Sequence, residues 1–324
     1  MKYRHLGNTD LKIGVIGVGC MTFGWRADAK EAEAIVSAAL DVGINLFDTS
    51  VSYGRGVSET LLGEALKKSG RRHELLIATK FGQAATSDAK PHEIGNSRRV
   101  LMAQCELSLR RLQTDRIDLL QIHNFSADVP IEDTLSGLDQ LVRDGKVRYV
   151  GCSNFTGSQL AAAVETVNVH EFSGIASHQA RFNLLDRRAE TDVMHVAHRS
   201  SVGNLAYSPL GEGLLAGKYH VGEAFPANSR FAAASPTNNY GARLTASVTQ
   251  AITSLDEAAA VHSLSLWQLA LARALANPAV SCALVGPSIS TQVKKLREVA
   301  DLPLGRDLMT LIEEINPAGA SVID

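Results

Sequence analysis

Four side chains of this sequence are of types that could together move a proton: Asp48, Tyr53, Lys80 and His123. A phenol, with a pKa of about 10, is a poor proton donor at neutral pH, but a neighbouring ammonium favours the phenolate and lowers that pKa. A carboxylate beside the ammonium would keep it charged and in place, and an imidazole can donate a hydrogen bond to a carbonyl oxygen that gains negative charge. The set therefore suits proton delivery to a carbonyl that receives a hydride. The hydride must come from a cofactor, because no side chain supplies one.

Each of these residues also has an ordinary structural explanation. An aspartate after a strand is most often an N-cap or turn residue, and a loop tyrosine usually packs its ring. A lysine at a strand end is usually solvated, and a histidine there is often a hydrogen-bonded structural group. What favours a shared site is position, because "NLFDTS" has Asp48 near its end, "LLIATK" and "IDLLQIH" end on Lys80 and His123, and Tyr53 follows the first segment.

The elements that must position these residues alternate along the chain. Short runs rich in Val, Ile and Leu predict eight strands, at residues 13–19, 45–50, 75–80, 117–123, 148–154, 174–179, 204–209 and 281–287. Longer patterns between them predict helices, among them 29–43, 97–113, 131–146, 156–167 and one that opens at Ser58. A βαβα order implies parallel strands with right-handed crossovers, and eight units favour a closed (β/α)8 barrel, a TIM barrel. The active site of such a barrel lies at the C-terminal ends of its strands.

Two segments depart from this alternation. The opening "RHLGNTDLKI" has a Gly-Asn-Thr-Asp turn between two extended pieces and predicts a short N-terminal hairpin. Residues 211–245, after the seventh strand, are rich in Gly, Ala, Asn and Pro and predict a long loop that is either functional or disordered. No linker divides the chain, so we expect one domain over residues 1–324.

Composition excludes several classes of protein. The 32 basic and 34 acidic residues are interspersed and give a net charge of −2, which argues against a nucleic-acid surface or a polybasic membrane arm. The four cysteines have no CxxC spacing, so we expect no metal site, and scattered single cysteines are typical of reduced thiols in the cytoplasm. The N-terminus has no apolar signal region and no apolar run is long enough to span a membrane. A cytoplasmic enzyme of small molecules fits best; the oligomeric state is not predicted.

Several segments in order resemble one known family. "GINLFDTSVSYGRGVSETLLGEAL", "IATKFG", "RIDLLQIHN" and "KVRYVGCSNF", followed by "YSPLGEGLLAGKY" and "LVGPSISTQV", are similar to the aldo-keto reductases along nearly the whole chain. The resemblance implies a (β/α)8 barrel that uses NADPH, or alternatively NADH, without a Rossmann motif. In agreement, no GxGxxG opens a helix after a strand. The implied reaction is the reduction of an aldehyde, ketone or sugar carbonyl to an alcohol, or the reverse, with hydride from C4 of the nicotinamide and the proton from Tyr53.

The resemblance also implies a role for individual residues. Tyr53 is expected to be the general acid–base, Lys80 and Asp48 the pair that tunes its pKa, and His123 the partner that orients the carbonyl. Ser153, Asn154 and Gln179 match positions that bind the nicotinamide carboxamide, and Tyr207 matches the ring that stacks on the nicotinamide. The full set expected to bind the cofactor is Gly19, Cys20, Met21, Asp48, Ser153, Asn154, Gln179, Tyr207, Ser208, Pro209, Leu210, Gly286, Ser288, Gln292 and Lys295.

This sequence departs from the family at the segment for the adenosine phosphate. Gln292 stands where an arginine often contacts the 2′-phosphate, and Lys294 and Lys295 stand where a Glu-Asn pair is usual, so the choice between NADPH and NADH stays open. Ser288 and Ser290 could either contact the cofactor or cap the start of the last helix. Cys20 replaces a usual threonine.

The substrate pocket is expected to include Tyr53 and His123 with three aromatic residues, Trp25, Phe81 and Phe125, and part of the loop after the seventh strand. Two other functions remain open. Some proteins of this fold, the potassium-channel β subunits, bind a membrane partner and use the cofactor as a sensor. Other relatives reduce an enone in a sugar nucleotide.

Overall fold

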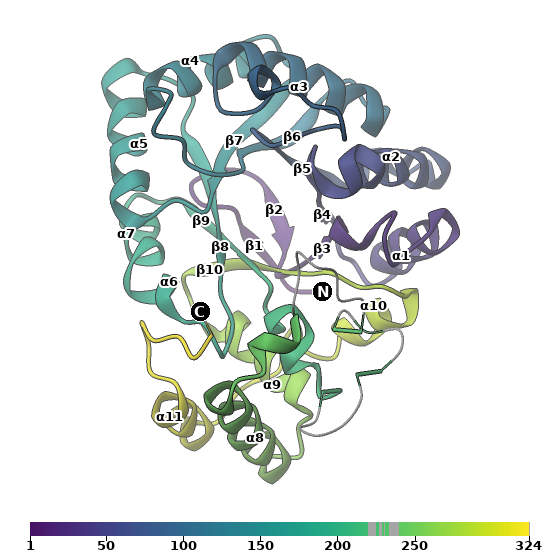
Figure 1. The fold of residues 1–324 in the computed structure, drawn as a ribbon, viewed down its shortest axis with the longest axis vertical. Coiled ribbons are helices and arrows are strands. Elements are labelled where there is room, and N and C mark those ends of the chain that lie inside the picture. The colour runs from purple at the N-terminus through teal and green to yellow at the C-terminus, as the bar shows by residue number, and fades with distance from the viewer. Residues whose placement is uncertain (220–224, 227–228, 230, 233–239, 324) are drawn as a thin grey trace.

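The computed structural model describes all residues of the chain except 220–224, 227–228, 230, 233–239 and 324. At its centre is a closed barrel of eight parallel strands in the order β10-β3-β4-β5-β6-β7-β8-β9 (Figure 1). These strands are β3 (Ile16–Gly19), β4 (Leu46–Asp48), β5 (Leu76–Phe81), β6 (Ile117–Ile122), β7 (Val147–Ser153), β8 (Ile175–Arg181), β9 (Gly203–Tyr207) and β10 (Val280–Val285). Every residue of β6 is buried, as expected for a strand covered on both faces. The predicted (β/α)8 barrel is confirmed.

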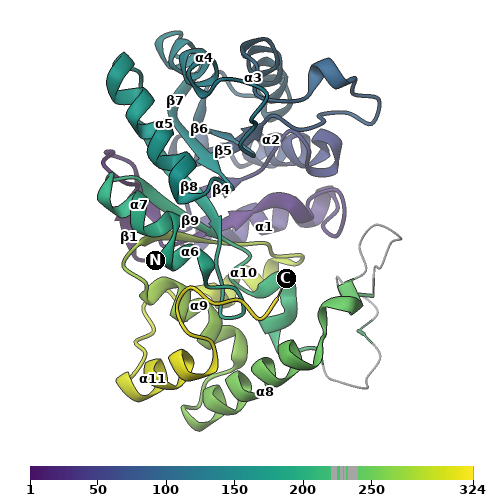
Figure 2. The same ribbon diagram turned by 60° about the vertical axis from the view of Figure 1, so that its left-hand side comes forward.

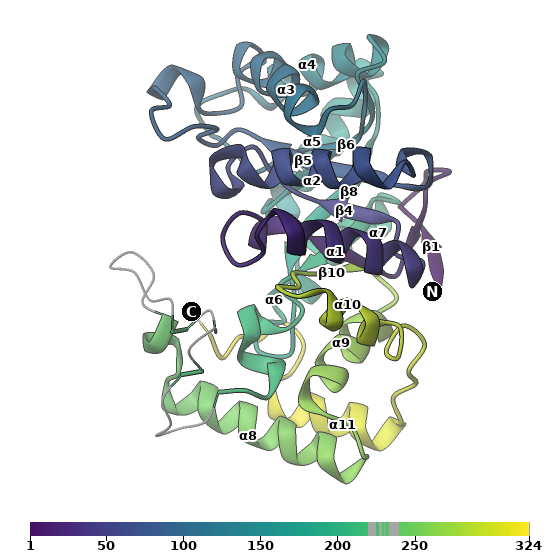
Figure 3. The same ribbon diagram turned by 90° about the vertical axis from the view of Figure 1, so that its right-hand side faces the viewer.

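Helices connect the strands and surround the barrel (Figure 3). They are α1 (Ala29–Asp41), α2 (Val57–Ser69), α3 (Arg98–Leu112), α4 (Ile131–Arg143), α5 (Gly157–His170), α6 (Arg188–Thr191), α7 (Val193–Arg199), α8 (Ala246–Val261), α9 (Leu266–Ala276), α10 (Ser290–Leu296) and α11 (Arg306–Ile315). Side-chain caps fix several starts, for example Asp28 on α1 and Ser97 on α3. None of the helices in the described residues is long and apolar enough to cross a membrane.

The predicted N-terminal hairpin is present and consists of β1 (Tyr3–His5) and β2 (Lys12–Gly14), paired antiparallel. Its residues Leu6, Leu11 and Ile13 join a buried cluster with Leu119 and Leu205 of the barrel strands. The hairpin therefore packs against one end of the barrel. The predicted first strand, 13–19, was too long, because the first two of its residues pair within the hairpin and only Ile16–Gly19 enter the barrel.

A second hydrophobic core lies beside the barrel, where α8, α9 and α11 are grouped (Figures 1 and 2). Leu184 and Leu185 after β8, and Leu214 and Leu215 after β9, pack into it. Through this core, the loop that follows β9 packs against the outer helices. Within the predicted loop 211–245, Gly211–Ala216 and Tyr240–Arg243 form short 3₁₀ turns, and the stretches named above lie outside the described residues.

The structure corrects two local predictions about helices and decides the open alternative for Ser288 and Ser290. The second helix begins at Val57 and has Gly56, in a left-handed conformation, as its N-cap, because the Ser58 hydroxyl donates instead to the Cys20 carbonyl oxygen. Neither Ser288 nor Ser290 caps α10, whose N-cap is Ile289 without a side-chain bond. That helix is also not the last one, since α11 follows it.

Candidate active site

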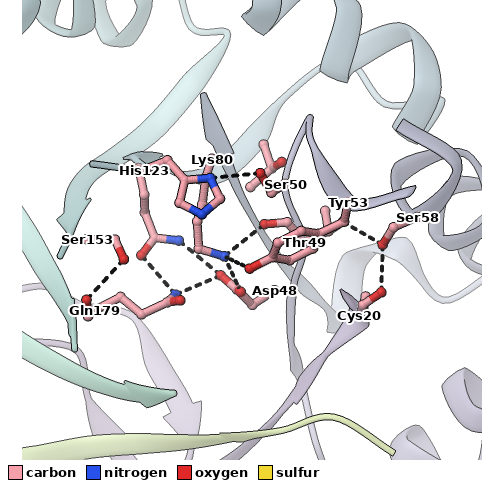
Figure 4. Close-up of polar contacts among 12 residues, drawn as sticks. Cys20, Asp48, Thr49, Ser50, Tyr53, Ser58, Lys80, His123, Ser153 and Gln179 are labelled. Carbon is pink, nitrogen blue, oxygen red and sulfur yellow. Dashed lines mark hydrogen bonds and ion pairs between the residues drawn. The ribbon is translucent and has the colours of Figure 1, made fainter. Parts of the chain in front are cut away.

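The four residues proposed for proton transfer lie together at the C-terminal ends of β4, β5 and β6 (Figure 4). Lys80 is 1% exposed and its ammonium is the centre of the group. Its Nζ lies 2.5 Å from Asp48 Oδ1, 3.0 Å from the Thr49 carbonyl oxygen and 3.2 Å from Tyr53 Oη. All three hydrogens of the ammonium therefore have acceptors, and the lysine is not the solvated strand-end residue that its position alone would suggest.

Asp48 is held from its other side by two amides that come from neighbouring strands. Gln121 Nε2 donates to Asp48 Oδ2 at 3.0 Å and Gln179 Nε2 donates to the same oxygen at 2.9 Å. Gln179 also lies 3.3 Å from Gln121 Oε1. Sequence reasoning missed Gln121, although it stands in the quoted "RIDLLQIHN" two residues before His123, where strand alternation points both side chains to the same face. Both donors are neutral amides, so they complete the hydrogen bonding of Asp48 Oδ2 and leave Oδ1 to the Lys80 ammonium.

The acid–base properties of Lys80 and Tyr53 follow from their burial and from each other. Burial by itself lowers the pKa of Lys80, but Asp48 and the Tyr53 hydroxyl raise it, and the net shift is upward. For Tyr53, burial raises the pKa above the ordinary value of 10.0, and the Lys80 ammonium opposes this only in part. The expectation of a lowered Tyr53 pKa is therefore wrong in its net direction, because desolvation outweighs the attraction of the ammonium. Tyr53 is a protonated phenol at neutral pH, the form that a proton donor needs.

The imidazole of His123 stands edge-on to the Tyr53 ring, with the ring centroids 6.0 Å apart and an interplanar angle of 85°. Its Nδ1 lies 3.1 Å from Ser50 Oγ, a contact that sequence reasoning did not foresee. The same Ser50 oxygen accepts from the Ser52 backbone N–H at 3.3 Å and lies 3.1 Å from the Ser52 hydroxyl, so the Ser50 hydroxyl can donate to the imidazole when the Ser52 hydroxyl donates to Ser50. A neutral ring that accepts at Nδ1 carries its proton on Nε2, which is then a donor.

Burial, and then the Lys80 charge, lower the pKa of His123 to about 3. We expect the His123 resonances of isotope-labelled protein to show no titration between about pH 8 and pH 5, a window in which an unperturbed histidine becomes charged. The unfolded chain then binds a proton at this residue that the folded chain does not, so this histidine makes stability fall as pH drops from about 6.5 towards 3. His123→Gln identifies the resonance, and a midpoint near 6.5 would contradict the neutral imidazole.

Most of the residues expected to bind the cofactor line one cavity of about 600 Å³ at this end of the barrel. They are Gly19, Met21, Asp48, Ser153, Asn154, Gln179, Tyr207, Ser208, Pro209, Leu210, Gly286, Ser288, Gln292 and Lys295. Tyr53 and His123 line the same cavity, while Lys80 lies behind them. Cys20 does not line it, because its side chain is fully buried and its carbonyl oxygen accepts from Ser58.

Polar side chains at the inner end of this cavity are fixed by bonds to one another. Ser153 Oγ donates to the Gln179 carbonyl oxygen at 3.0 Å. Asn154 has a left-handed backbone with φ of 59°, and its Nδ2 donates to the His123 carbonyl oxygen at 3.0 Å. The Tyr207 hydroxyl donates to Asn154 Oδ1 at 2.9 Å, which fixes the edge of that ring. The three strand ends β7, β8 and β9 are thus connected before any ligand binds.

The three aromatic residues proposed for the substrate pocket lie outside the cavity. Phe81 is fully buried in the main hydrophobic core, where strand alternation turns it to the opposite side from Lys80. Phe125 packs edge-on against Phe155 at 5.3 Å, and Trp25 is 45% exposed. The cavity lining includes Glu212, Lys218 and Arg243 of the loop 211–245, as expected for part of that loop, and also Arg26 and Trp267, which sequence reasoning missed. Only the fold brings them here, since they belong to loops and to α9.

Comparisons with known proteins agree with this geometry. The chain matches the family model described as Aldo/keto reductase family over residues 15–317. It is 31% identical over 324 residues to YrpG, an uncharacterized oxidoreductase of Bacillus subtilis, covering 98% of this chain and 96% of that protein. It is 31% identical over 279 residues to yakc, an NADP(+) aldo-keto reductase of Schizosaccharomyces pombe, covering 85% and 79%. It is 30% identical over 305 residues to a probable voltage-gated potassium channel subunit beta of Arabidopsis thaliana, covering 93% and 92%. Because the family model spans the whole barrel and the relatives align with most of the chain, this protein belongs to the aldo/keto reductase family.

Proposed function

We propose that the protein is an NADPH-dependent oxidoreductase that reduces an aldehyde, ketone or sugar carbonyl to the alcohol, or catalyses the reverse reaction. The observation that carries the proposal is the buried Lys80 ammonium, which contacts both Asp48 and the Tyr53 hydroxyl beside a cavity. A buried ammonium needs such acceptors to offset its loss of hydration, and a phenol in contact with it is in position for proton transfer. Membership of the family and the named oxidoreductase relatives support the same class of reaction.

The cavity suits a nicotinamide dinucleotide in size, charge and hydrogen bonding. Its volume of about 600 Å³ is in the range of cofactor sites, and its lining includes Arg26, Lys218 and Lys295 as well as the ion pair of Arg243 with Glu212, so it offers cations that suit phosphates. Within the described residues, Gln179 Oε1 has no protein donor, so it can accept from a carboxamide at the inner end. The cofactor would supply the hydride, from C4 of the nicotinamide.

The chain's own residues would supply the rest of the chemistry. His123, with its proton on Nε2, would donate a hydrogen bond to the carbonyl oxygen of the substrate. Tyr53 would transfer its hydroxyl proton to that oxygen as the carbonyl carbon is reduced, and the Lys80 ammonium would stabilise the phenolate that remains. Asp48, held by its two amide donors, would keep the ammonium charged during the step. In the direction of oxidation the same phenolate would accept the proton of the alcohol.

We further propose that the chain is one domain of the cytoplasm that acts on small molecules, with no nucleic acid or membrane as a partner. The free and buried state of all four cysteines supports a reducing compartment. The relative from Arabidopsis thaliana favours a second candidate function, a cofactor-binding protein that acts through a partner instead of through turnover. A sugar-nucleotide enone reductase is a third candidate, which would use the same cavity for a different reduction.

The test is turnover of reduced cofactor by the purified protein with a panel of aldehydes, ketones and sugars, followed by the absorbance of the reduced nicotinamide. Carbonyl reduction predicts an alcohol product from at least one of them. Tight cofactor binding with no turnover of any carbonyl or enone would favour the partner-binding function. A saturated ketone as product from a sugar-nucleotide enone would favour the third candidate.

The cofactor preference can be tested at Gln292, which lines the cavity beside Lys295. Gln292 Oε1 accepts from the Ser288 backbone N–H at 2.9 Å, so this side chain stabilises the turn that precedes α10. It has no charge to offer to a phosphate. We expect Gln292→Arg to raise the ratio of the NADH to the NADPH dissociation constant by about ten- to a hundredfold, since a charge-assisted bond to the 2′-phosphate contributes about 1.5–3 kcal/mol. Fluorescence titration with both cofactors measures the ratio.

Gln292→Met is the matched control, because it removes the acceptor for Ser288 without adding a charge. This variant should raise the dissociation constants of NADPH and NADH to a similar extent. An unchanged ratio in Gln292→Arg would mean that the 2′-phosphate site lies elsewhere in the cavity, with Arg26 as the next residue to substitute.

A further inference from the structure

The loop that carries Tyr53 has an unusual backbone. The three residues that follow the tyrosine, Gly54, Arg55 and Gly56, all have positive φ angles, of 56°, 55° and 93°. Positive φ is unfavourable for a residue with a side chain, so Arg55 in particular adopts this conformation at a cost. Such a conformation persists only where the surrounding structure enforces it. The question is which contacts of this loop do so.

Backbone bonds hold part of the loop, since the N–H of Val51 donates to the Lys80 carbonyl oxygen at 3.1 Å and that of Arg55 to the Ser52 carbonyl oxygen at 3.0 Å. Further contacts come from Arg111 in the last turn of α3, which packs beside α2 (Figure 1). Its Nη1 lies 3.4 Å from the Val51 carbonyl oxygen, and its Nη2 lies 3.5 Å from the Arg55 carbonyl oxygen and 2.9 Å from that of Ala85. Val51 and Arg55 stand two residues before and two residues after Tyr53. One guanidinium therefore spans the ends of the segment that presents the phenol.

The guanidinium is itself held by a buried acid of α2. Arg111 Nη1 donates to Glu59 Oε2 at 3.2 Å, and Thr79 Oγ1 donates to Glu59 Oε1 at 2.7 Å. Glu59 is fully buried, and Thr79 is the residue before Lys80 on β5. The four terminal hydrogens of the guanidinium thus have four acceptors, one more than the three hydrogens of a lysine ammonium could serve. Through Glu59 and Thr79, this ion pair connects the loop that carries Tyr53 to β5, the strand that carries Lys80.

Gly56 shows how closely this guanidinium is packed against the loop. A Cβ atom at position 56 would lie 2.0 Å from Arg111 Cζ. The glycine is therefore required twice, by its φ of 93° and by the guanidinium that covers it. Neither Glu59 nor Arg111 lines the cavity, so the pair has no direct contact with a substrate or cofactor.

We propose that Arg111, fixed by Glu59, is a positioning residue for the proton donor: its guanidinium holds residues 51–55 so that the Tyr53 hydroxyl stays on the Lys80 ammonium. The inference rests on the proposed function, since it assigns the pair to the proton-transfer step. It predicts that loss of the guanidinium affects proton transfer and leaves the cofactor site intact, because that site is built by β7, β8, β9 and the segment after β10. A displacement of 1 Å at a reacting group can cost about a hundredfold in rate.

The experiment compares Arg111→Ala with Arg110→Ala, whose side chain is exposed on the same helix. We expect kcat of Arg111→Ala to fall about a hundredfold while its NADPH dissociation constant changes by less than about threefold. The solvent deuterium isotope effect on kcat should rise, because the misplaced proton donor becomes limiting. Added guanidinium ion should restore part of kcat in a saturable way, and ethylammonium, which has the charge but not the fork, should not. Arg110→Ala should behave as the wild type.

Two further measurements separate the possible failures. Arg111→Lys keeps the charge opposite Glu59, so it serves if Arg111→Ala does not fold, and its kcat should still fall with cofactor binding kept. A crystal structure of either variant should show Tyr53 Oη beyond hydrogen-bond distance from Lys80 Nζ, a result that needs no turnover. An unchanged Tyr53–Lys80 contact, or wild-type kcat in folded Arg111→Ala, would overturn the positioning role. Absence of carbonyl turnover in the wild type would instead count against the proposed function.

Discussion

Replacing Tyr53 by phenylalanine is expected to lower kcat by about 10²–10⁴-fold and to leave the NADPH dissociation constant nearly unchanged. The substitution removes only the hydroxyl, which lies 3.2 Å from Lys80 Nζ and is the proposed source of the proton. The phenyl ring keeps its edge-on contact with His123, so the shape of the cavity is preserved. Steady-state turnover with the best carbonyl and a fluorescence titration with NADPH measure the two quantities.

Tyr149→Phe is the matched control for this substitution. Its hydroxyl donates to Asp10 of the N-terminal hairpin region, on the side of the barrel away from the cavity. Loss of that hydroxyl should leave kcat and cofactor affinity as they are in the wild type. Turnover of Tyr53→Phe within a few-fold of the wild type would rule out the phenol as the acid–base group.

The second large effect is expected for Lys80→Met, which should abolish measurable turnover and lower the free energy of unfolding by about 3–5 kcal/mol. Lys80 and Asp48 form a buried ion pair with side-chain exposures of 1% and 3%, so removal of the lysine leaves a buried charge without its partner. Denaturation by urea, followed by circular dichroism, measures the stability. An exposed pair gives the comparison, because Lys68→Met, opposite Glu33, should cost no more than about 1 kcal/mol.

The double variant Lys80→Met with Asp48→Asn separates stability from chemistry. A neutral amide at position 48 no longer needs the ammonium, so much of the lost stability should return. Turnover should not return, because the Tyr53 phenolate would still lack its cation. Recovery of turnover together with stability would mean that the ion pair has a structural role only.

The sequence allowed the barrel and the proton-transfer group to be predicted for physical reasons that can be named. Parallel strands buried on both faces give short apolar runs, and their carboxyl ends must meet at one end of a closed barrel. Asp48, Lys80 and His123 could therefore be grouped without knowledge of any distance. Position at a strand end was enough to group these three residues, while Tyr53 was added because it closely follows Asp48 in the sequence.

Some features escaped prediction because they depend on contacts that the sequence pattern does not encode, whereas Phe81 and Gln121 were missed although strand alternation indicates their directions. The net direction of the Tyr53 pKa shift depends on how much water is excluded, and burial outweighs the Lys80 charge. Phe81 directly follows Lys80 in the sequence, yet the alternation of β5 turns it into the core. Arg111 lies near the end of a helix, where a basic residue is ordinary, and only the close approach of α3 to the loop after β4 reveals its four carbonyl and carboxylate partners.

Cofactor binding, on which the proposed reaction depends, can be measured by a fluorescence titration of the purified wild-type protein with NADPH and with NADH. The proposed nicotinamide site, at the part of the cavity lined by Ser153, Gln179 and Tyr207, predicts saturable binding of at least one of them with a micromolar or tighter dissociation constant. Addition of a carbonyl substrate should then oxidise the reduced nicotinamide, and so abolish its fluorescence, in the wild type and not in Tyr53→Phe. Absence of binding below millimolar concentrations of either cofactor would contradict the proposed oxidoreductase function, because the cavity would then have no source of hydride for a carbonyl beside Tyr53.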